Sequence, residues 1–318
     1  MADERTERTR FTYGPVPSRR LGMSLGVDIV PPKICTLDCI YCQLGRTPQT
    51  TTTRGDFVDV PAVLDELADR LRSGTQADYI TIGGSGEPTL NLRLGDLIDG
   101  IRRLTTIPVA LLTNGTLLYR PEVRADCAKA DVVAPSLDAG DATAFEAVNR
   151  PARDITIESL VSGLEQFRRE FGGQIWLEVF LIGGVNTDAQ QIGKIKALIA
   201  RIQPDRVHLN TAVRPPAEPG VEPLSRDRLD AIAAEIGGRC EVIGEAPGGP
   251  SERHDVHAEA DLVSMLKRRP CTADDIATGL GMSRNEVAKH LSRLQRQRVA
   301  TSERRGGTLY FHIRPETP

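Results

Sequence analysis

Three cysteines stand within one short segment, ICTLDCIYCQLGRT. Cys35, Cys39 and Cys42 form a C-x3-C-x2-C run, and no histidine precedes His208. A structural zinc site takes four protein ligands, so zinc is the less favoured interpretation. Thiolates also hold 4Fe–4S clusters, which normally take four cysteines. Because three cysteines leave one iron open to a small molecule, the run predicts a functional cluster.

The remaining cysteines are Cys127, Cys240 and Cys271, which are dispersed along the chain. Six cysteines in 318 residues are too few for a disulfide scaffold. We therefore expect these three to be ordinary buried thiols. The chain starts with charged residues, and no apolar run approaches the ~20 residues needed to span a bilayer. We expect a cytoplasmic protein without membrane contact.

An aromatic residue, Tyr41, precedes the last cysteine of the run, and this pattern resembles the radical S-adenosylmethionine (SAM) superfamily. The likeness covers most of residues 13–215. The resemblance implies a 4Fe–4S cluster and SAM as cofactors, with the amine and carboxylate of SAM on the open iron. One electron would split SAM into methionine and a 5′-deoxyadenosyl radical. The expected electron donor is a flavodoxin- or ferredoxin-type protein.

Further motifs match the SAM contacts of that superfamily. GGSGEP, which begins at Gly83, resembles the motif that holds the methionyl amine. Ser136 and Asp138 match ribose contacts, although Asp138 could instead cap a helix. Asn114 and Asn186 lie at strand ends, where each is either a contact or a turn residue. The expected cofactor-binding residues are Tyr41, Gly84, Ser85, Gly86, Glu87, Asn114, Ser136, Asp138 and Ile182.

The substrate is left open by the sequence. The lead-in GPVPSRRLGMSLGVDIVPPK resembles small wyosine-synthase-like radical SAM proteins, but it assigns no role to Arg19 and Arg20. Wyosine-forming enzymes hold a second cluster on upstream cysteines, whereas this chain has no cysteine before Cys35. His208 and Asn210 alternate on one strand face, and for His208 we prefer the role of a core residue. No residue is predicted to be catalytic.

Strands and helices that could position these residues alternate along the chain. Amphipathic segments such as PAVLDELADRLRS separate six β-rich runs, and this order predicts right-handed βαβ crossovers and a parallel sheet. Six units are too few for a closed eight-stranded barrel. We predict an α/β fold in which a partial (β/α)6 radical SAM barrel is followed by a small winged helix-turn-helix domain. The β-rich runs cover residues 24–30, 79–84, 108–114, 131–137, 175–184 and 206–213.

The winged helix is expected from three helical segments and a two-stranded hairpin. Thr272 with Asp275 and Ser283 with Glu286 have the spacing of capping boxes, and Gly281 suits a helix end. We expect a flexible tail, a radical SAM domain, a linker and the winged helix domain, in that order. Their expected bounds are 1–12, 13–243, 244–257 and 258–318.

Charge divides the chain in the same way. Residues 258–318 hold 11 basic and 7 acidic groups, a net charge of +4 within a chain of net charge −3. This excess favours a nucleic acid as partner, although a peptide partner or a merely solvated basic face is also compatible with it. The residues expected to face a partner lie on the third helix and the hairpin, and all but Asn285 are basic: Arg284, Asn285, Lys289, Arg293, Arg296, Arg304 and Arg305.

Two functions fit these features. The first is a radical SAM enzyme whose winged helix recruits a nucleic acid or peptide substrate. The second is a DNA-binding transcriptional regulator that senses iron–sulfur chemistry or SAM. A sensor needs the three cysteines but not the motifs for the SAM amine and ribose, so the sequence favours the enzyme.

Overall fold

An eight-stranded sheet forms the centre of the computed structural model, which describes residues 11–243, 258–305 and 307–314. The strands follow chain order across the sheet; β1 pairs antiparallel with β2, and the later neighbours are parallel. The α/β fold with a mostly parallel sheet is therefore confirmed. The strands are β1 Thr12–Ser18, β2 Gly22–Val27, β3 Tyr79–Ile82, β4 Val109–Leu112, β5 Val132–Ala134, β6 Gln174–Leu181, β7 Arg206–Thr211 and β8 Cys240–Val242.

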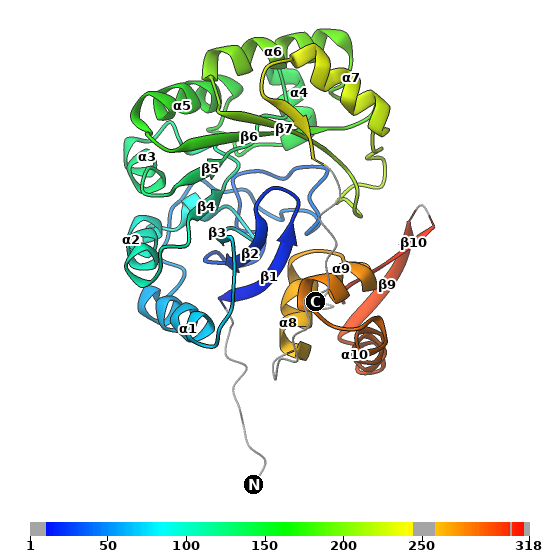
Figure 1. Cartoon of the computed structure of the whole chain (residues 1–318). Coiled ribbons are helices and arrows are strands. Elements are labelled where there is room, and N and C mark those ends of the chain that lie inside the picture. The colour runs from blue at the N-terminus through cyan, green and yellow to red at the C-terminus, as the bar shows by residue number, and fades with distance from the viewer. Residues whose placement is uncertain (1–10, 244–257, 306, 315–318) are drawn as a thin grey trace.

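Helices cover the outer face of this curved sheet (Figure 1). The predicted amphipathic segments form α1, α2, α5 and α6, whose apolar stripes face the sheet; in α2, Leu94, Leu97, Ile98 and Ile101 are fully buried. The helices are α1 Val60–Arg72, α2 Leu94–Leu104, α3 Pro121–Cys127, α4 Ala142–Asn149, α5 Ile157–Glu170, α6 Ala189–Ile202 and α7 Arg226–Ile236. None of the described helices is both long and apolar enough to cross a membrane.

Strand β1 was not predicted from the sequence. Its segment TYGPVPS contains two prolines, which cannot donate to a ladder and restrict a strand to the edge of a sheet. The backbone amides of Phe11 and Thr12 donate to Glu66 of α1. Residues 11 and 12, at the end of the segment that was expected to be a tail over residues 1–12, are therefore bonded to the fold. Residues 1–10 and the expected linker 244–257 lie outside the described residues.

Residues 258–305 and 307–314 form what we call the C-terminal unit. It contains α8 Ala258–Arg268, α9 Ala273–Leu280, α10 Arg284–Arg296 and an antiparallel hairpin of β9 Ala300–Arg305 and β10 Thr308–Ile313. Both predicted capping boxes are present, and Gly281 ends α9 in the left-handed conformation. Val287, Leu291 and Leu294 of α10 are buried in a core of its own, as predicted.

The C-terminal unit packs against the edge of the sheet at β1 (Figure 1). Its α9 lies against Pro17 of β1 at Gly279. Arg70 of α1 pairs with Asp261 of α8 at 3.2 Å. On the opposite side of the unit, the Tyr310 hydroxyl donates to the carbonyl of Val213 at 2.8 Å. The unit therefore contacts both β1 and the loop that follows β7.

Candidate functional site

The three clustered cysteines lie in the loop that follows β2, at the carboxyl end of the parallel sheet. In parallel sheets, this edge is where ligands bind. Each sulfur faces a nitrogen donor from a different part of the chain. The contacts are Lys33 Nζ to Cys42 Sγ at 3.1 Å, Asn149 Nδ2 to Cys39 Sγ at 3.4 Å and Asn114 Nδ2 to Cys35 Sγ at 3.6 Å.

These thiols suit a cluster better than one ion. Nowhere in the described part of the chain are three or more His, Cys, Asp or Glu side chains gathered closely enough to hold a single metal ion. A 4Fe–4S cluster binds each thiolate through a separate iron, so its ligands stand further apart. Burial raises the pKa of Cys35 to about 12 and that of Cys39 well above its usual value. Metal binding must therefore displace their protons.

The GGSGEP loop after β3 is joined directly to the cysteine loop. Lys33 N donates to Ser85 O at 2.8 Å, and Glu87 N donates to Ile34 O at 3.0 Å. A side chain at Gly86 would place its Cβ only 2.3 Å from Ile34 O, so only glycine allows this approach. Gly84 is exposed, which leaves its backbone accessible beside the cysteine loop.

Glu87 is directed into the protein rather than toward the open side of the site. Its buried carboxylate accepts hydrogen bonds from Thr89 N at 3.0 Å, Thr113 Oγ1 at 2.6 Å and Asn114 N at 2.7 Å. Burial raises the pKa of this carboxyl. Glu87 thus holds the loops after β3 and β4 together, a role that its position in the motif did not reveal.

Both carboxylate oxygens of Asp138 accept hydrogen bonds from within the protein. Its carboxylate accepts from Phe180 N at 2.8 Å, Tyr41 Oη at 2.5 Å and Asn149 Nδ2 at 2.8 Å. Burial raises its pKa to about 6. The alternative that Asp138 caps a helix is wrong, because Asp141 is the N-cap of α4. Asp138 instead fixes Tyr41 of the cysteine loop against β6.

Beside it, Tyr41 stacks on Phe180 with ring centroids 3.9 Å apart and planes 10° from parallel. This pair belongs to an apolar group with Ile182 and Val221. Ser136 is half-buried at the end of β5, and its hydroxyl makes no hydrogen bond to any residue that the structure describes. The arrangement thus offers an apolar surface and, on the neighbouring strand, a free hydroxyl.

Asn114, which was expected among the cofactor contacts, and Asn186, which was either a contact or a turn residue, both bond within the protein. The side chain of Asn114 joins Thr36 of the cysteine loop to Thr116. Asn186 is buried and bonds Ile182 N at 2.7 Å and Phe180 O at 2.8 Å. Sequence reasoning missed Lys33 and Asn149 as donors to sulfur. Lys33 adjoins the cysteines, but Asn149 lies 110 residues from Cys39, and no local pattern marks it.

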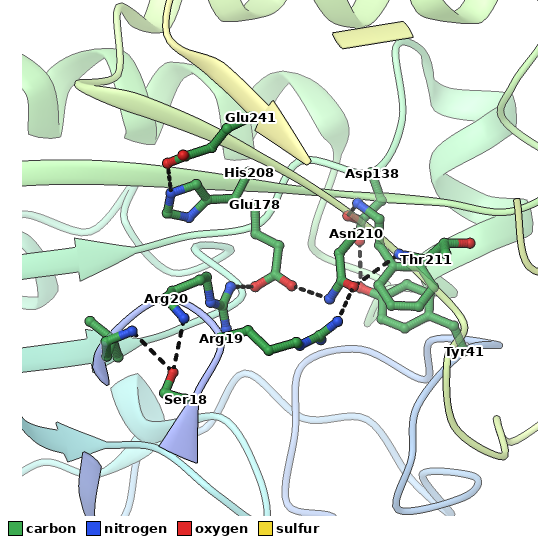
Figure 2. A network of polar contacts seen from close by, with 12 residues as sticks. Ser18, Arg19, Arg20, Tyr41, Asp138, Glu178, His208, Asn210, Thr211 and Glu241 are labelled. Carbon is green, nitrogen blue, oxygen red and sulfur yellow. Dashed lines mark hydrogen bonds and ion pairs between the residues drawn. The ribbon is translucent and has the colours of Figure 1, made fainter. Parts of the chain in front are cut away.

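A polar network crosses the barrel interior (Figure 2). Arg20, in the β1–β2 turn, pairs with Glu178 of β6, which accepts from Asn210 Nδ2 of β7 at 2.9 Å. Arg19 Nη1 donates to Asn210 Oδ1 at 3.0 Å. His208 is buried with Nε2 3.0 Å from Glu241 Oε1, and burial lowers its pKa.

A partial α/β barrel with a three-cysteine loop at the carboxyl end of its first parallel strand defines the class of radical SAM proteins. Residues 29–194 match the Radical SAM superfamily. A relative from Helicobacter pylori (strain ATCC 700392 / 26695), named UPF0026 protein, is 32% identical over 309 residues, which are 96% of this chain and 98% of the relative. The chain therefore belongs to the radical SAM superfamily and to the UPF0026 family.

Two further comparisons cover less of the other protein. The chain is 36% identical over 309 residues to a protein named GTPase Obg from Brachyspira hyodysenteriae; this is 96% of the chain but 45% of that relative. The structure of Streptococcus suis SuiB bound to precursor peptide SuiA superposes with a TM-score of 0.54 at 15% identity, over 69% of this chain and 48% of SuiB. This second likeness is one of fold alone.

Proposed function

We propose that this protein is a radical SAM enzyme in which Cys35, Cys39 and Cys42 hold a 4Fe–4S cluster with one open iron. The observation that carries the proposal is the set of three thiols, each facing a nitrogen donor, next to the glycine loop. When bound, the cluster would supply the electron that splits SAM into methionine and a 5′-deoxyadenosyl radical. Hydrogen bonds to cluster sulfurs tune its potential.

The groups around the cysteine loop suit the three parts of SAM. The exposed backbone at Gly84 would receive the methionyl amine, and the free hydroxyl of Ser136 would receive the ribose. The apolar group of Tyr41, Phe180 and Ile182 would hold adenine. Asp138 and Glu87 act indirectly in this proposal, because their carboxylates already accept hydrogen bonds that order the loops.

The electron donor would be a flavodoxin- or ferredoxin-type protein that reaches the cysteine loop from outside the barrel. A cavity of about 690 Å³ opens beside this loop and is lined by Asp38, Arg46, Arg150 and a run of threonines. Thr51 N in that run donates to Cys35 O at 3.0 Å, so the cavity wall contacts a cluster ligand directly. This position would allow short electron transfer to the cluster.

We further propose that residues 13–243 form the radical SAM domain and that the C-terminal unit is a winged helix that recruits substrate. Its three helices and hairpin support that assignment. The basic side chains of α10 predicted to face outward, such as Arg284, Lys289 and Arg296, are exposed. The resemblance to wyosine-synthase-like proteins makes RNA one candidate and peptide another. No observation on the structure favours a transcriptional regulator.

Formation of 5′-deoxyadenosine tests the proposed chemistry. Anaerobically reconstituted protein is mixed with SAM and dithionite, and the products are separated by chromatography. The wild type should hold about four irons per chain and form 5′-deoxyadenosine. Alanine at Cys35, Cys39 or Cys42 should abolish both, whereas Cys240→Ala, in half-buried β8, should retain both. An iron-loaded wild type that leaves SAM intact would contradict the proposal.

A further inference from the structure

Four arginines come together where the barrel meets the C-terminal unit. Arg19 and Arg20 belong to the β1–β2 turn, Arg214 follows β7, and Arg269 follows α8. The charges of Arg20, Arg214 and Arg269 all act on Arg19, and that of Arg269 acts on Arg214. Three separate parts of the chain therefore converge to make this group, which we call the arginine cluster.

The arginine cluster is only partly neutralised. Arg20 pairs with Glu178, and Arg214 Nη2 lies 3.4 Å from Asp275 Oδ1. Neither Arg19 nor Arg269 forms an ion pair with any residue in the described ranges. Four guanidinium groups thus face two carboxylates, and two positive charges remain in excess.

Burial makes this excess costly. The Arg214 side chain is only 13% exposed, and its buried Nε has no hydrogen-bond partner among the described residues. Burial, and then the neighbouring Arg214, lowers the pKa of Arg19 to about 10. Buried charges and donors are normally paired, so the cluster lacks an anionic acceptor.

We propose that the arginine cluster binds a phosphate group of the substrate. A phosphate monoester carries about −1.5 to −2 charges and several acceptor oxygens, which suits an excess of two positive charges. The planar guanidinium donors of Arg19 and Arg214 match phosphate oxygens better than lysine would. This proposal rests on the radical SAM function proposed above, and it names the chemical class of the substrate.

The carboxylate of SAM is the other anion that could bind such a site. The contacts of the arginine cluster favour the substrate rather than SAM. Arg19 bonds Asn210, and Arg20 bonds Glu178, whereas no hydrogen bond in the described chain joins either side chain to Tyr41 or to the cysteines. Arg214 is joined to the C-terminal unit rather than to the cysteine loop. Substrate phosphate would thus lie between the barrel interior and that unit.

Binding of inorganic phosphate to the reconstituted, full-length protein tests this site. Isothermal titration at constant ionic strength should detect binding to the wild type without reductant. Arg19→Gln and Arg214→Gln should each weaken it roughly tenfold or more, because a charge-assisted hydrogen bond is lost. The matched control is Arg226→Gln in α7, where the guanidinium is exposed and paired with Asp230; it should bind as the wild type does.

SAM affinity, measured on the same proteins, separates the two sources of the anion. Arg19→Gln should bind SAM as the wild type does. A parallel loss of SAM affinity would assign the site to the SAM carboxylate and overturn the proposal, as would a wild type that binds no phosphate or variants that bind it equally. Arg19→Lys, which keeps the charge, should restore part of the phosphate binding and guards against misfolding of the glutamine variant.

The radical SAM function and the phosphate site are tested by different measurements. Phosphate binding needs no electron, whereas 5′-deoxyadenosine formation does. A wild type that binds phosphate through Arg19 but never cleaves SAM would retain the anion site and refute the radical chemistry. A wild type that cleaves SAM but binds no phosphate would support the radical chemistry and refute the anion site.

Discussion

Arg268 Nε, at the end of α8, lies 3.2 Å from the carboxylate of Asp28, the residue that follows β2. The same carboxylate oxygen accepts Ser85 N at 3.1 Å and Ser85 Oγ at 2.5 Å. Arg268 also lies 4.1 Å from the ring centroid of Tyr13, whose hydroxyl donates to Gly83 O at 2.9 Å. One side chain of the C-terminal unit therefore contacts two residues that bond to the GGSGEP loop, Asp28 and Tyr13.

Arg268→Met should weaken SAM binding several-fold while leaving iron content unchanged. The substitution keeps an apolar stem but removes the ion pair and the cation–π contact, so the loop that we assign to the methionyl amine loses order. Equilibrium dialysis with labelled SAM measures the effect. Arg296→Met, on the exposed face of α10, is the control. Equal SAM affinity in the two variants would show that the C-terminal unit does not act on this loop.

Lys33→Gln should lower the reduction potential of the cluster. Lys33 Nζ lies 3.1 Å from Cys42 Sγ, and a positive charge that donates to a ligating sulfur stabilises the added electron. A redox titration followed by electron paramagnetic resonance gives the potential. Lys129→Gln removes an ion pair with Asp99 of α2 and no contact with Cys35, Cys39 or Cys42, so it should leave the potential unchanged. An unshifted or raised potential in Lys33→Gln would exclude this donor role.

The sequence was sufficient for the features that are local or periodic. The stripe of α2 and the run from Cys35 to Cys42 are each defined by spacing within a few residues, so helix and cysteine loop were both predictable. Direction was not. The carboxylates of Glu87 and Asp138 bond to residues from other elements, and a motif gives the position of a side chain in the chain but not where it points.

Long-range contacts explain the remaining differences. The arginine cluster combines Arg19 with Arg214 and Arg269, which are separated by about 200 residues and more along the chain, and basic residues at these positions form no sequence pattern. Strand β1 was hidden because its prolines oppose strand propensity, although an edge position tolerates them. Such features depend on which elements contact one another in the folded chain, so they could be identified only from the structure.

Asp141 should stabilise the protein at neutral pH and lose that effect in acid. Asp141 caps α4 by accepting from Ala144 N, and it pairs with Lys194 at 2.6 Å. The hydrogen bonds from Lys194, Ala144 N and Gln191 lower the pKa of Asp141 to about 2. Because the folded pKa lies below the unfolded value near 4, the stabilisation is complete above that value and is lost as pH falls through about 2.

Alanine at position 141 should therefore cost about 1 kcal/mol at pH 7, and the difference from the wild type should shrink between pH 4 and the acid limit of folding. Urea melts at several pH values measure it. Asp141→Asn retains the cap without the charge and should lie between the two proteins. A difference that does not change with pH would show that the charge of Asp141 contributes nothing.

The C-terminal unit, if it binds nucleic acid, should do so chiefly through its hairpin. Arg293 of α10 is already paired with Glu259 at 2.8 Å. Arg304 is exposed in the hairpin, and its only bond to a described residue is to the carbonyl of Gly307 in its own turn. Reversing Arg304 and Arg305 to glutamate should thus weaken binding to all sequences alike, and more than Arg293→Gln does.

Fluorescence anisotropy with labelled duplex DNA and with single-stranded RNA, over a range of salt concentrations, tests this expectation on the full-length protein. Phosphate contacts release counterions, so the logarithm of the binding constant must fall linearly with the logarithm of salt concentration, and loss of two contacts should reduce the steepness of that slope by about 2. An affinity that does not depend on salt concentration, or no binding at low ionic strength, would rule out nucleic acid and leave a peptide as the partner that this unit recruits.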